Sequence, residues 1–210
     1  MSVNPTSPDP IPENIDYFVE WRPWLWRRPV IDALRFLGGL RGKRVLEIGG
    51  RSGRMTSLLA LQGAHVTMLE RSGTDKAAAE VARWNVRDRV RLVKTDGGLE
   101  ALGNETFDVI FTKSVLWSVE HLEPFLEELD SHLVPGGKAA FLENYRGGPF
   151  WMCLRRTFIH RGRFGYERHY FGITPVQLDL FRQRFDGVRV HRRLWMVYEI
   201  FGHKRPRNDQ

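Results

Sequence analysis

Short apolar runs alternate with longer amphipathic segments along most of this chain. The apolar runs are typical of buried strands, whereas the segments between them place their apolar residues at helical spacing. This pattern predicts strands at 44–48, 65–69, 90–94, 107–112 and 138–142, and helices at 54–62, 74–84 and 122–133. Regular strand–helix alternation favours an α/β fold in which a parallel sheet carries helices on both faces, the doubly wound arrangement.

The two ends of the chain depart from this alternation. Residues 1–14 contain four Pro and few apolar residues, which predicts a disordered lead. Residues 15–42 predict one or two short helices or a lid ahead of the first strand. Thr174 as an N-cap and Pro175 at the first helical position predict a helix that reaches about residue 184. Two final strands, which complete a mostly parallel seven-stranded sheet, are expected at 187–193 and 196–202.

Residues 145–174 have no regular period and predict a cap inserted after the fifth strand. Between positions 146 and 168 there are six Arg and a single acid, Glu167. Such a segment could recognise an anionic acceptor or contact an anionic membrane surface, and the alternative is a solvated basic face. The cap belongs to a single domain at 15–206, followed by a tail at 207–210.

Composition narrows the class of protein. With 42% hydrophobic and 12% aromatic residues the chain is expected to fold. No apolar stretch is long enough to span a membrane and no signal peptide is recognisable, so we expect a cytoplasmic protein. The one cysteine, Cys153, excludes an intramolecular disulfide and a cysteine-built metal site, and we expect no metal. The net charge of +7 comes mainly from 26 Arg among 32 basic residues, which composition bias explains as well as an anionic partner does.

A Gly-rich turn follows the first predicted strand and carries the strongest chemical signal. Glu47 precedes Gly49, Gly50 and Gly53, and a helix follows. Such a turn lets a ligand approach the backbone at the carboxyl edge of the sheet. A carboxylate at this place suits a cation better than the pyrophosphate of a dinucleotide.

With four further motifs, residues 43–206 resemble the class I S-adenosylmethionine (SAM)-dependent methyltransferases. Glu47, Gly49 and Gly53 match the first motif, and the fourth strand and the Pro-Gly-Gly run before the fifth also match. The resemblance implies a Rossmann-like fold, SAM as cofactor and S-adenosylhomocysteine as product. It implies that Glu70 binds the ribose hydroxyls and Asp96 the adenine amino group. The expected cofactor-binding residues are Glu47, Gly49, Gly50, Gly53, Glu70, Arg71, Asp96, Gly97 and Lys113. Arg51 replaces the usual middle Gly. Its side chain either crowds the cofactor or points to solvent, and we favour the orientation toward solvent.

The acceptor site should lie above the strand ends. Residues 112–115 read Thr-Lys-Ser-Val rather than the Asn-Pro-Pro-Tyr type of enzymes that methylate base amines, and Cys153 stands alone, which argues against RNA cytosine methylation. Residues 113–121 resemble ubiquinone-biosynthesis-like O-methyltransferases, although Ser118 replaces their His and His121 is interpreted as a surface residue. Candidate acceptor contacts are Trp21, Trp117, Asn144, Arg155 and Arg156. Candidate general bases are His160, His169, Tyr145 and Tyr170.

These observations predict SAM-dependent methylation of a small molecule, on O, N or C, in specialised or lipid-related metabolism. Two alternatives stay open: an RNA methyltransferase that uses the basic cap, and a SAM-binding scaffold without turnover. We expect a small-molecule acceptor and no DNA partner. An acceptor that carries an anionic group would suit the basic cap. Weak membrane-surface contact and a homodimer stay open.

Overall fold

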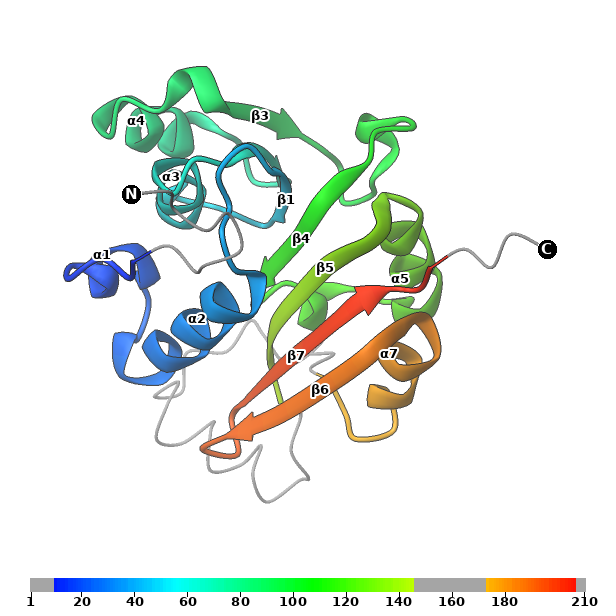
Figure 1. The fold of residues 1–210 in the computed structure, drawn as a ribbon. Helices are drawn as coiled ribbons and strands as arrows, with labels where there is room; N and C mark the ends of the chain where they lie inside the picture. Colours follow the sequence, from blue (N-terminus) through cyan, green and yellow to red (C-terminus); the bar gives the residue numbers. More distant parts are fainter. Residues whose placement is uncertain (1–9, 146–172, 207–210) are drawn as a thin grey trace, which may run out of the picture.

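The computed structural model describes residues 10–145 and 173–206. Its core is a seven-stranded sheet in the order β3-β2-β1-β4-β5-β7-β6 (Figure 1). The strands β3, β2, β1, β4 and β5 run parallel, whereas β7 is antiparallel to both of its neighbours. Their bounds are β1 (Arg44–Ile48), β2 (His65–Glu70), β3 (Val90–Lys94), β4 (Phe107–Lys113), β5 (Leu133–Asn144), β6 (Phe185–Arg193) and β7 (Val197–Lys204).

Helices cover both faces of this sheet, as a doubly wound fold requires (Figure 1). One face packs against α1 (Ile15–Val19), α2 (Pro23–Leu37), α3 (Arg54–Leu61) and α4 (Asp75–Arg83). The other face packs against α5 (Leu122–Ser131) and α7 (Leu178–Arg184). Successive side chains of a strand point to opposite faces of the sheet. Buried Val45 therefore packs in the core beneath α1–α4, and buried Leu46 packs in the core beneath α5 and α7. Short 3₁₀ helices η1 (Arg87–Arg89), η2 (Glu100–Leu102) and η3 (Leu116–Ser118) lie in the connections.

The hydrophobic pattern predicted the class and the succession of elements correctly. Strand β5 is longer than predicted, because Leu133 already pairs with Phe107 ahead of a register shift. The predicted start of the last helix is wrong: α7 begins at Leu178 rather than Pro175. Thr174 and Gln177 do exchange hydrogen bonds, at 3.0 and 3.3 Å, as a capping pair does. The residues between them form tighter turns with i→i+3 bonds, from Leu178 N–H to Pro175 O at 3.3 Å.

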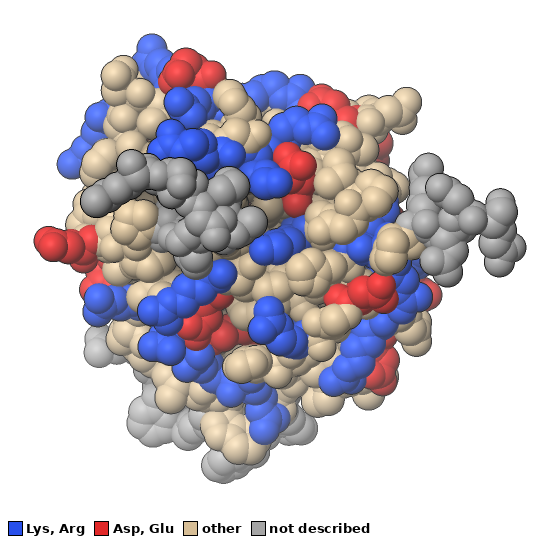
Figure 2. Space-filling model, viewed as in Figure 1, with Lys and Arg blue, Asp and Glu red and all other residues tan. Residues whose placement is uncertain are grey.

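The described residues bear on two points raised by the composition: membrane-spanning segments and the distribution of basic side chains. In the described ranges, no helix has the length and apolar character needed to cross a membrane. Lys and Arg side chains are spread over the face seen in Figure 2, with acidic side chains among them. On this face, basic side chains are therefore spread over a broad surface rather than gathered at one compact site. Most of the predicted cap, residues 146–172, lies outside the described residues.

Candidate functional site

A cavity of about 2100 Å³ opens at the carboxyl edge of the parallel strands. It is lined by the turn after β1, the ends of β2 and β4, the loop after β3 and the connection between α1 and α2. Open α/β sheets bind ligands at this edge, where loops from neighbouring strands diverge. Every cofactor-binding residue predicted from the sequence except Gly53 lines this cavity.

The Gly-rich turn forms one wall, and its geometry excludes larger residues. Gly49 has φ +74°, and a Cβ built on it would lie 2.5 Å from Val115 Cγ2. A Cβ on Gly50 would lie 2.6 Å from Met68 Sδ. Gly53 has φ +77° and is the N-cap of α3, where a Cβ would lie 2.7 Å from Ala77 Cα. Gly53 does not line the cavity, and its lack of a side chain lets α3 pack closely against α4.

Glu70, the last residue of β2, presents an oriented carboxylate to the cavity. Its Oε2 accepts the backbone N–H of Arg51 at 2.8 Å, and its Oε1 accepts the backbone N–H and the hydroxyl of Ser72 at 2.8 and 2.7 Å. Burial alone would raise the pKa of Glu70, but these hydrogen bonds outweigh it and hold the pKa below its usual value. The Ser72 hydroxyl can rotate away, so the ionised carboxylate can accept donors from a ligand.

Glu47 lies deeper in the floor of the cavity and is only 3% exposed. Burial raises the pKa of Glu47 to about 7, although the Thr56 hydroxyl donates to its Oε2 at 2.5 Å and Lys113 favours the charged form. The Lys113 ammonium has a lowered pKa, mainly because of burial, and donates to Val19 O at 3.2 Å. Lys113 thus connects the end of β4 with the end of α1.

The connection between α1 and α2 closes one side of the cavity. Ser52 of the Gly-rich turn donates to Glu20 Oε2 at 2.7 Å. Arg54 donates to Tyr17 O at 3.1 Å, and its guanidinium lies 4.3 Å from the Tyr17 ring centroid. These contacts hold the N-terminal helices against the predicted cofactor motif.

The charges of this wall favour a nucleoside with a cationic group over a dinucleotide. The pyrophosphate of a dinucleotide needs free backbone N–H donors at the turn and the start of the helix. Here the N–H of Arg51 is already bonded to Glu70, and a second carboxylate, Glu47, lines the same floor. Arg51 has φ +45° and is an exposed residue that also lines the cavity, so its exposure does not distinguish the two predicted orientations.

Further predicted residues gather at the rim of the same cavity. Asp96, Gly97 and Arg71 are exposed residues that line it. The loop that carries Asp96 is connected to β2, because the N–H of Thr95 donates to Glu70 O at 3.0 Å. The structure therefore brings the carboxylates of Glu70 and Asp96 to one wall.

Three of the predicted acceptor contacts, Trp21, Trp117 and Asn144, also line the cavity. The indole N–H of Trp117 donates to Ser114 O and the amide of Asn144 donates to Ser114 Oγ, both at 2.6 Å. The loop after β4 is thus held to the end of β5, and His121, at the start of α5, is an exposed residue of the rim.

Sequence reasoning missed Glu143, which anchors this loop. Glu143 is fully buried at the end of β5 and accepts the Thr112 hydroxyl at 2.7 Å and the backbone N–H groups of Val115 and Leu116 at 3.0 and 2.9 Å. Burial raises the pKa of Glu143 to about 7 despite these bonds. A carboxyl residue after the apolar run Ala-Ala-Phe-Leu was the available signal, since such a residue needs partners when buried.

The remaining predicted residues lie elsewhere. Tyr145 is not among the described residues that line the cavity, because its ring turns to the α7 face and meets Tyr198 edge to face at 5.2 Å. The prediction that places Tyr145 with the reacting groups is therefore not supported by its position. The other proposed bases and two acceptor contacts lie outside the described residues: His160, His169, Tyr170, Arg155 and Arg156.

Comparisons with known proteins agree with this geometry. A family model described as a methyltransferase domain matches residues 18–161. A ubiquinone/menaquinone biosynthesis C-methyltransferase of Idiomarina loihiensis is 31% identical over 179 residues, which cover 80% of this chain and 66% of that protein. A demethylmenaquinone methyltransferase of Clavibacter sepedonicus is 29% identical over 121 residues, which cover 57% of this chain and 47% of that protein. The chain therefore spans about half to two thirds of the length of these curated relatives.

The fold also matches solved structures. The 1,6-didemethyltoxoflavin-N1-methyltransferase of Burkholderia thailandensis, solved with S-adenosylhomocysteine, superposes with a TM-score of 0.60 at 22% identity. The match covers 79% of this chain and 72% of that one. At 22% identity, this structural similarity supports the fold alone.

Proposed function

Because this chain belongs to the class I SAM-dependent methyltransferase family, we propose that it transfers a methyl group from SAM to a small-molecule acceptor. The observation that carries the proposal is the ionised, backbone-oriented carboxylate of Glu70 at the cavity wall, beside a Gly-rich turn whose amide is already bonded. Carboxylates accept strong hydrogen bonds from hydroxyl groups, which suits the two hydroxyls of a ribose. The pKa of the Glu47 carboxyl in the floor is raised to about 7, and the positive charge of a sulfonium bound nearby would favour its ionised form.

Bound SAM would supply an electrophilic methyl group, so the chain itself needs to align the acceptor and exclude water. Trp117 and Asn144 are the described residues that we assign to the acceptor side, since both line the cavity beyond the end of β4. Glu143 is assigned as a positioning residue, because it fixes the backbone from which Trp117 projects. None of these roles requires a proton transfer.

The acceptor class is proposed from the relatives. One curated relative is named a ubiquinone/menaquinone biosynthesis C-methyltransferase and the other a demethylmenaquinone methyltransferase, which supports a lipid-related acceptor methylated on carbon as the first candidate. Acceptors methylated on O or N remain the alternatives from the sequence. No observation on the described residues favours an RNA acceptor over a small molecule.

Calorimetry and a transfer assay test the proposal. The full chain should bind SAM and S-adenosylhomocysteine and should not bind NAD with comparable affinity. Methyl-labelled SAM should then transfer its label to a demethylated quinone. Tight binding of NAD without binding of SAM would reject the proposal, whereas SAM binding without transfer to quinone, phenol or amine acceptors would favour the scaffold alternative. Label transfer to RNA, with a steep dependence on salt, would indicate the second alternative.

A further inference from the structure

Large apolar side chains that remain exposed are concentrated at one edge of this molecule. Over residues 10–145 and 173–206, six such side chains are found, of which Leu61, 46% exposed, ends α3 at the amino edge of the sheet. The other five belong to the α1–α2 connection, the start of α2, the turn before α7 and the β6–β7 turn. They are Trp21 (45%), Trp24 (61%), Val176 (80%), Leu194 (57%) and Trp195 (59%).

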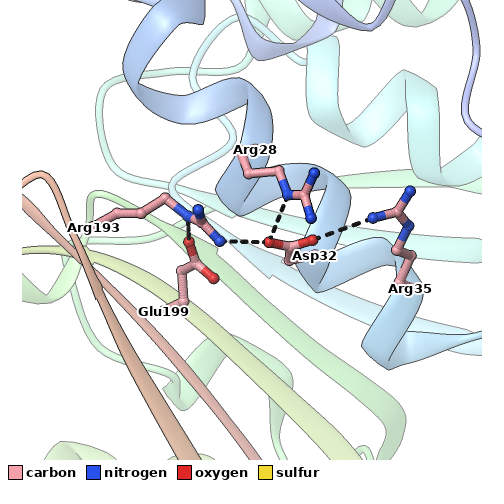
Figure 3. Close-up of polar contacts among 5 residues, drawn as sticks. All are labelled: Arg28, Asp32, Arg35, Arg193 and Glu199. Atoms are coloured by element: carbon pink, nitrogen blue, oxygen red, sulfur yellow. Dashed lines mark hydrogen bonds and ion pairs between the residues drawn. The ribbon is translucent and has the colours of Figure 1, made fainter.

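Contacts between α2 and β6 place two of these groups at the same end. The Arg189 guanidinium lies 5.2 Å from the Phe36 ring, and Arg193 donates to Asp32 at 2.7 Å (Figure 3). Helix α2 and strand β6 therefore run antiparallel, so the start of α2 and the turn after Arg193 project together. Figure 1 shows both at the lower left.

The same end is the carboxyl edge at which the cavity opens. Trp21, just before α2, lines the cavity itself. Val197, at the far side of the β6–β7 turn, pairs with Asn144 at the end of β5. Val176 follows Ile173, which bridges to Tyr145 directly after β5. Trp21 therefore lines the cavity, and the other four side chains lie at the same carboxyl edge of the sheet. We call this set the tryptophan rim.

The β6–β7 turn breaks a local rule of sequence. Met196 N–H donates to Arg193 O at 2.9 Å, and the two central residues, Leu194 and Trp195, have φ of +47° and +53°. This is the type I′ hairpin turn, which Asn and Gly favour because they adopt positive φ at little cost. Two bulky apolar residues are strained there and exposed as well. Such violations concentrate at functional positions.

Arginine accompanies the exposed rings. The Arg192 guanidinium lies 3.8 Å from the Trp195 ring centroid, and that of Arg22 lies 4.7 Å from the Trp21 ring centroid. Trp prefers the interface between lipid and water, and guanidinium groups bind phosphate. Two copies of this chain facing each other would bring these cations together, which is unfavourable.

We propose that the tryptophan rim, with the exposed Arg192, seats the carboxyl edge on an anionic phospholipid membrane, so that the cavity opens toward the bilayer. The attachment is peripheral and goes beyond the proposed methyl transfer, on which it does not depend. Trp195 and Leu194 enter the interface at the tip of the hairpin, while Arg192 contacts lipid phosphates. A lipid-soluble acceptor would then reach the cavity without crossing bulk water.

Vesicle sedimentation with the full chain tests this proposal. The chain should bind vesicles of one part phosphatidylglycerol to two parts phosphatidylcholine more tightly than vesicles of phosphatidylcholine alone. The double variant Leu194→Asn/Trp195→Gly carries the residues that the turn prefers, so the hairpin should form at least as well. We expect this variant to bind the anionic vesicles at least about tenfold more weakly, since two interfacial side chains are removed.

Leu61→Asn is the matched control, because it removes an exposed Leu at the opposite edge. Its vesicle affinity should equal that of the wild type. Wild-type affinity in the hairpin variant, an equal loss in the Leu61 variant, or no vesicle binding at all would overturn the proposal. So would a dimer in vesicle-free sedimentation that the hairpin variant abolishes, since the rim would then join two copies. A chain that binds vesicles as expected but not SAM would instead contradict the proposed function alone.

Discussion

The backbone N–H of Arg51 donates to Oε2 of Glu70 at 2.8 Å and thereby joins the turn after β1 to the end of β2. If Glu70 also holds the ribose of SAM, Glu70→Ala should weaken SAM binding by roughly tenfold to a few hundredfold, because charged hydrogen bonds contribute about 1.5–3 kcal/mol each. Calorimetry measures the dissociation constant. Glu120→Ala removes an exposed carboxylate from the same cavity and should leave SAM affinity unchanged. An unchanged affinity in folded Glu70→Ala would contradict the assignment.

A pair of glycine variants should separate backbone strain from steric overlap. Gly42 and Gly53 have nearly equal φ, +73° and +77°, but a Cβ on Gly42 meets no atom within 4 Å, whereas one on Gly53 meets Ala77 Cα at 2.7 Å. Gly42→Ala should lower the free energy of unfolding by about 1–2 kcal/mol from strain alone. Gly53→Ala should lower the free energy of unfolding by about 1–3 kcal/mol more than Gly42→Ala does, because α3 and α4 must move apart. Urea denaturation measures both, and equal losses would show that the overlap is relieved without cost.

The ion pairs that involve Asp32 of α2 and Arg193 of β6 should differ greatly in their effect on stability (Figure 3). Arg193 contacts Glu199, whose side chain is only 1% exposed, and also bonds Asp32. Arg193→Gln should lower the free energy of unfolding by about 3 kcal/mol, because it leaves a buried carboxylate without its cation. Arg28→Gln breaks a pair in which the Arg side chain is 62% exposed and should cost less than about 1 kcal/mol.

Adding Glu199→Gln to Arg193→Gln gives the decisive control for this prediction. The second change removes the buried charge, so the double variant should recover part of the lost stability. If the two changes simply add, the loss does not arise from an unpaired carboxylate.

The stability of the cofactor-free chain should fall as pH rises from about 5 to about 8. Burial raises the pKa of Glu47 and of Glu143 to about 7, so the native state binds more protons than the unfolded state in this window. Stability from a raised carboxyl pKa is present at low pH and is lost as the native carboxyl ionises, up to about 3 kcal/mol for each group. The pKa of Glu70 is lowered, so its contribution to stability is lost only as the pH falls below this window.

Glu143→Gln supplies the comparison for the pH dependence, because a neutral amide cannot titrate. Urea denaturation at several pH values should show a smaller fall for this variant than for the wild type, and the difference between the two curves isolates Glu143 from other groups. Parallel curves would mean that Glu143 titrates alike in both states.

By itself, the sequence determined the doubly wound class, the succession of strands and helices, and the wall made by Glu47, Gly49 and Glu70. These features depend on local periodicity and on motifs whose residues lie at the ends of neighbouring parallel strands. Their proximity follows from the fold class alone. The start of α7 was misplaced because Thr174 caps a turn that tightens before it becomes an α-helix.

Only the tertiary structure decided which side chains far apart in the sequence meet. Glu143 anchors the loop after β4, Tyr145 turns away from the cavity, and Trp24 projects with Trp195 from the same edge. Each outcome depends on the face to which a residue turns at the end of a strand, and on how α2 lies along β6. Those relations arise from packing between distant segments, where the free energy of burying one side chain depends on partners that local sequence does not specify.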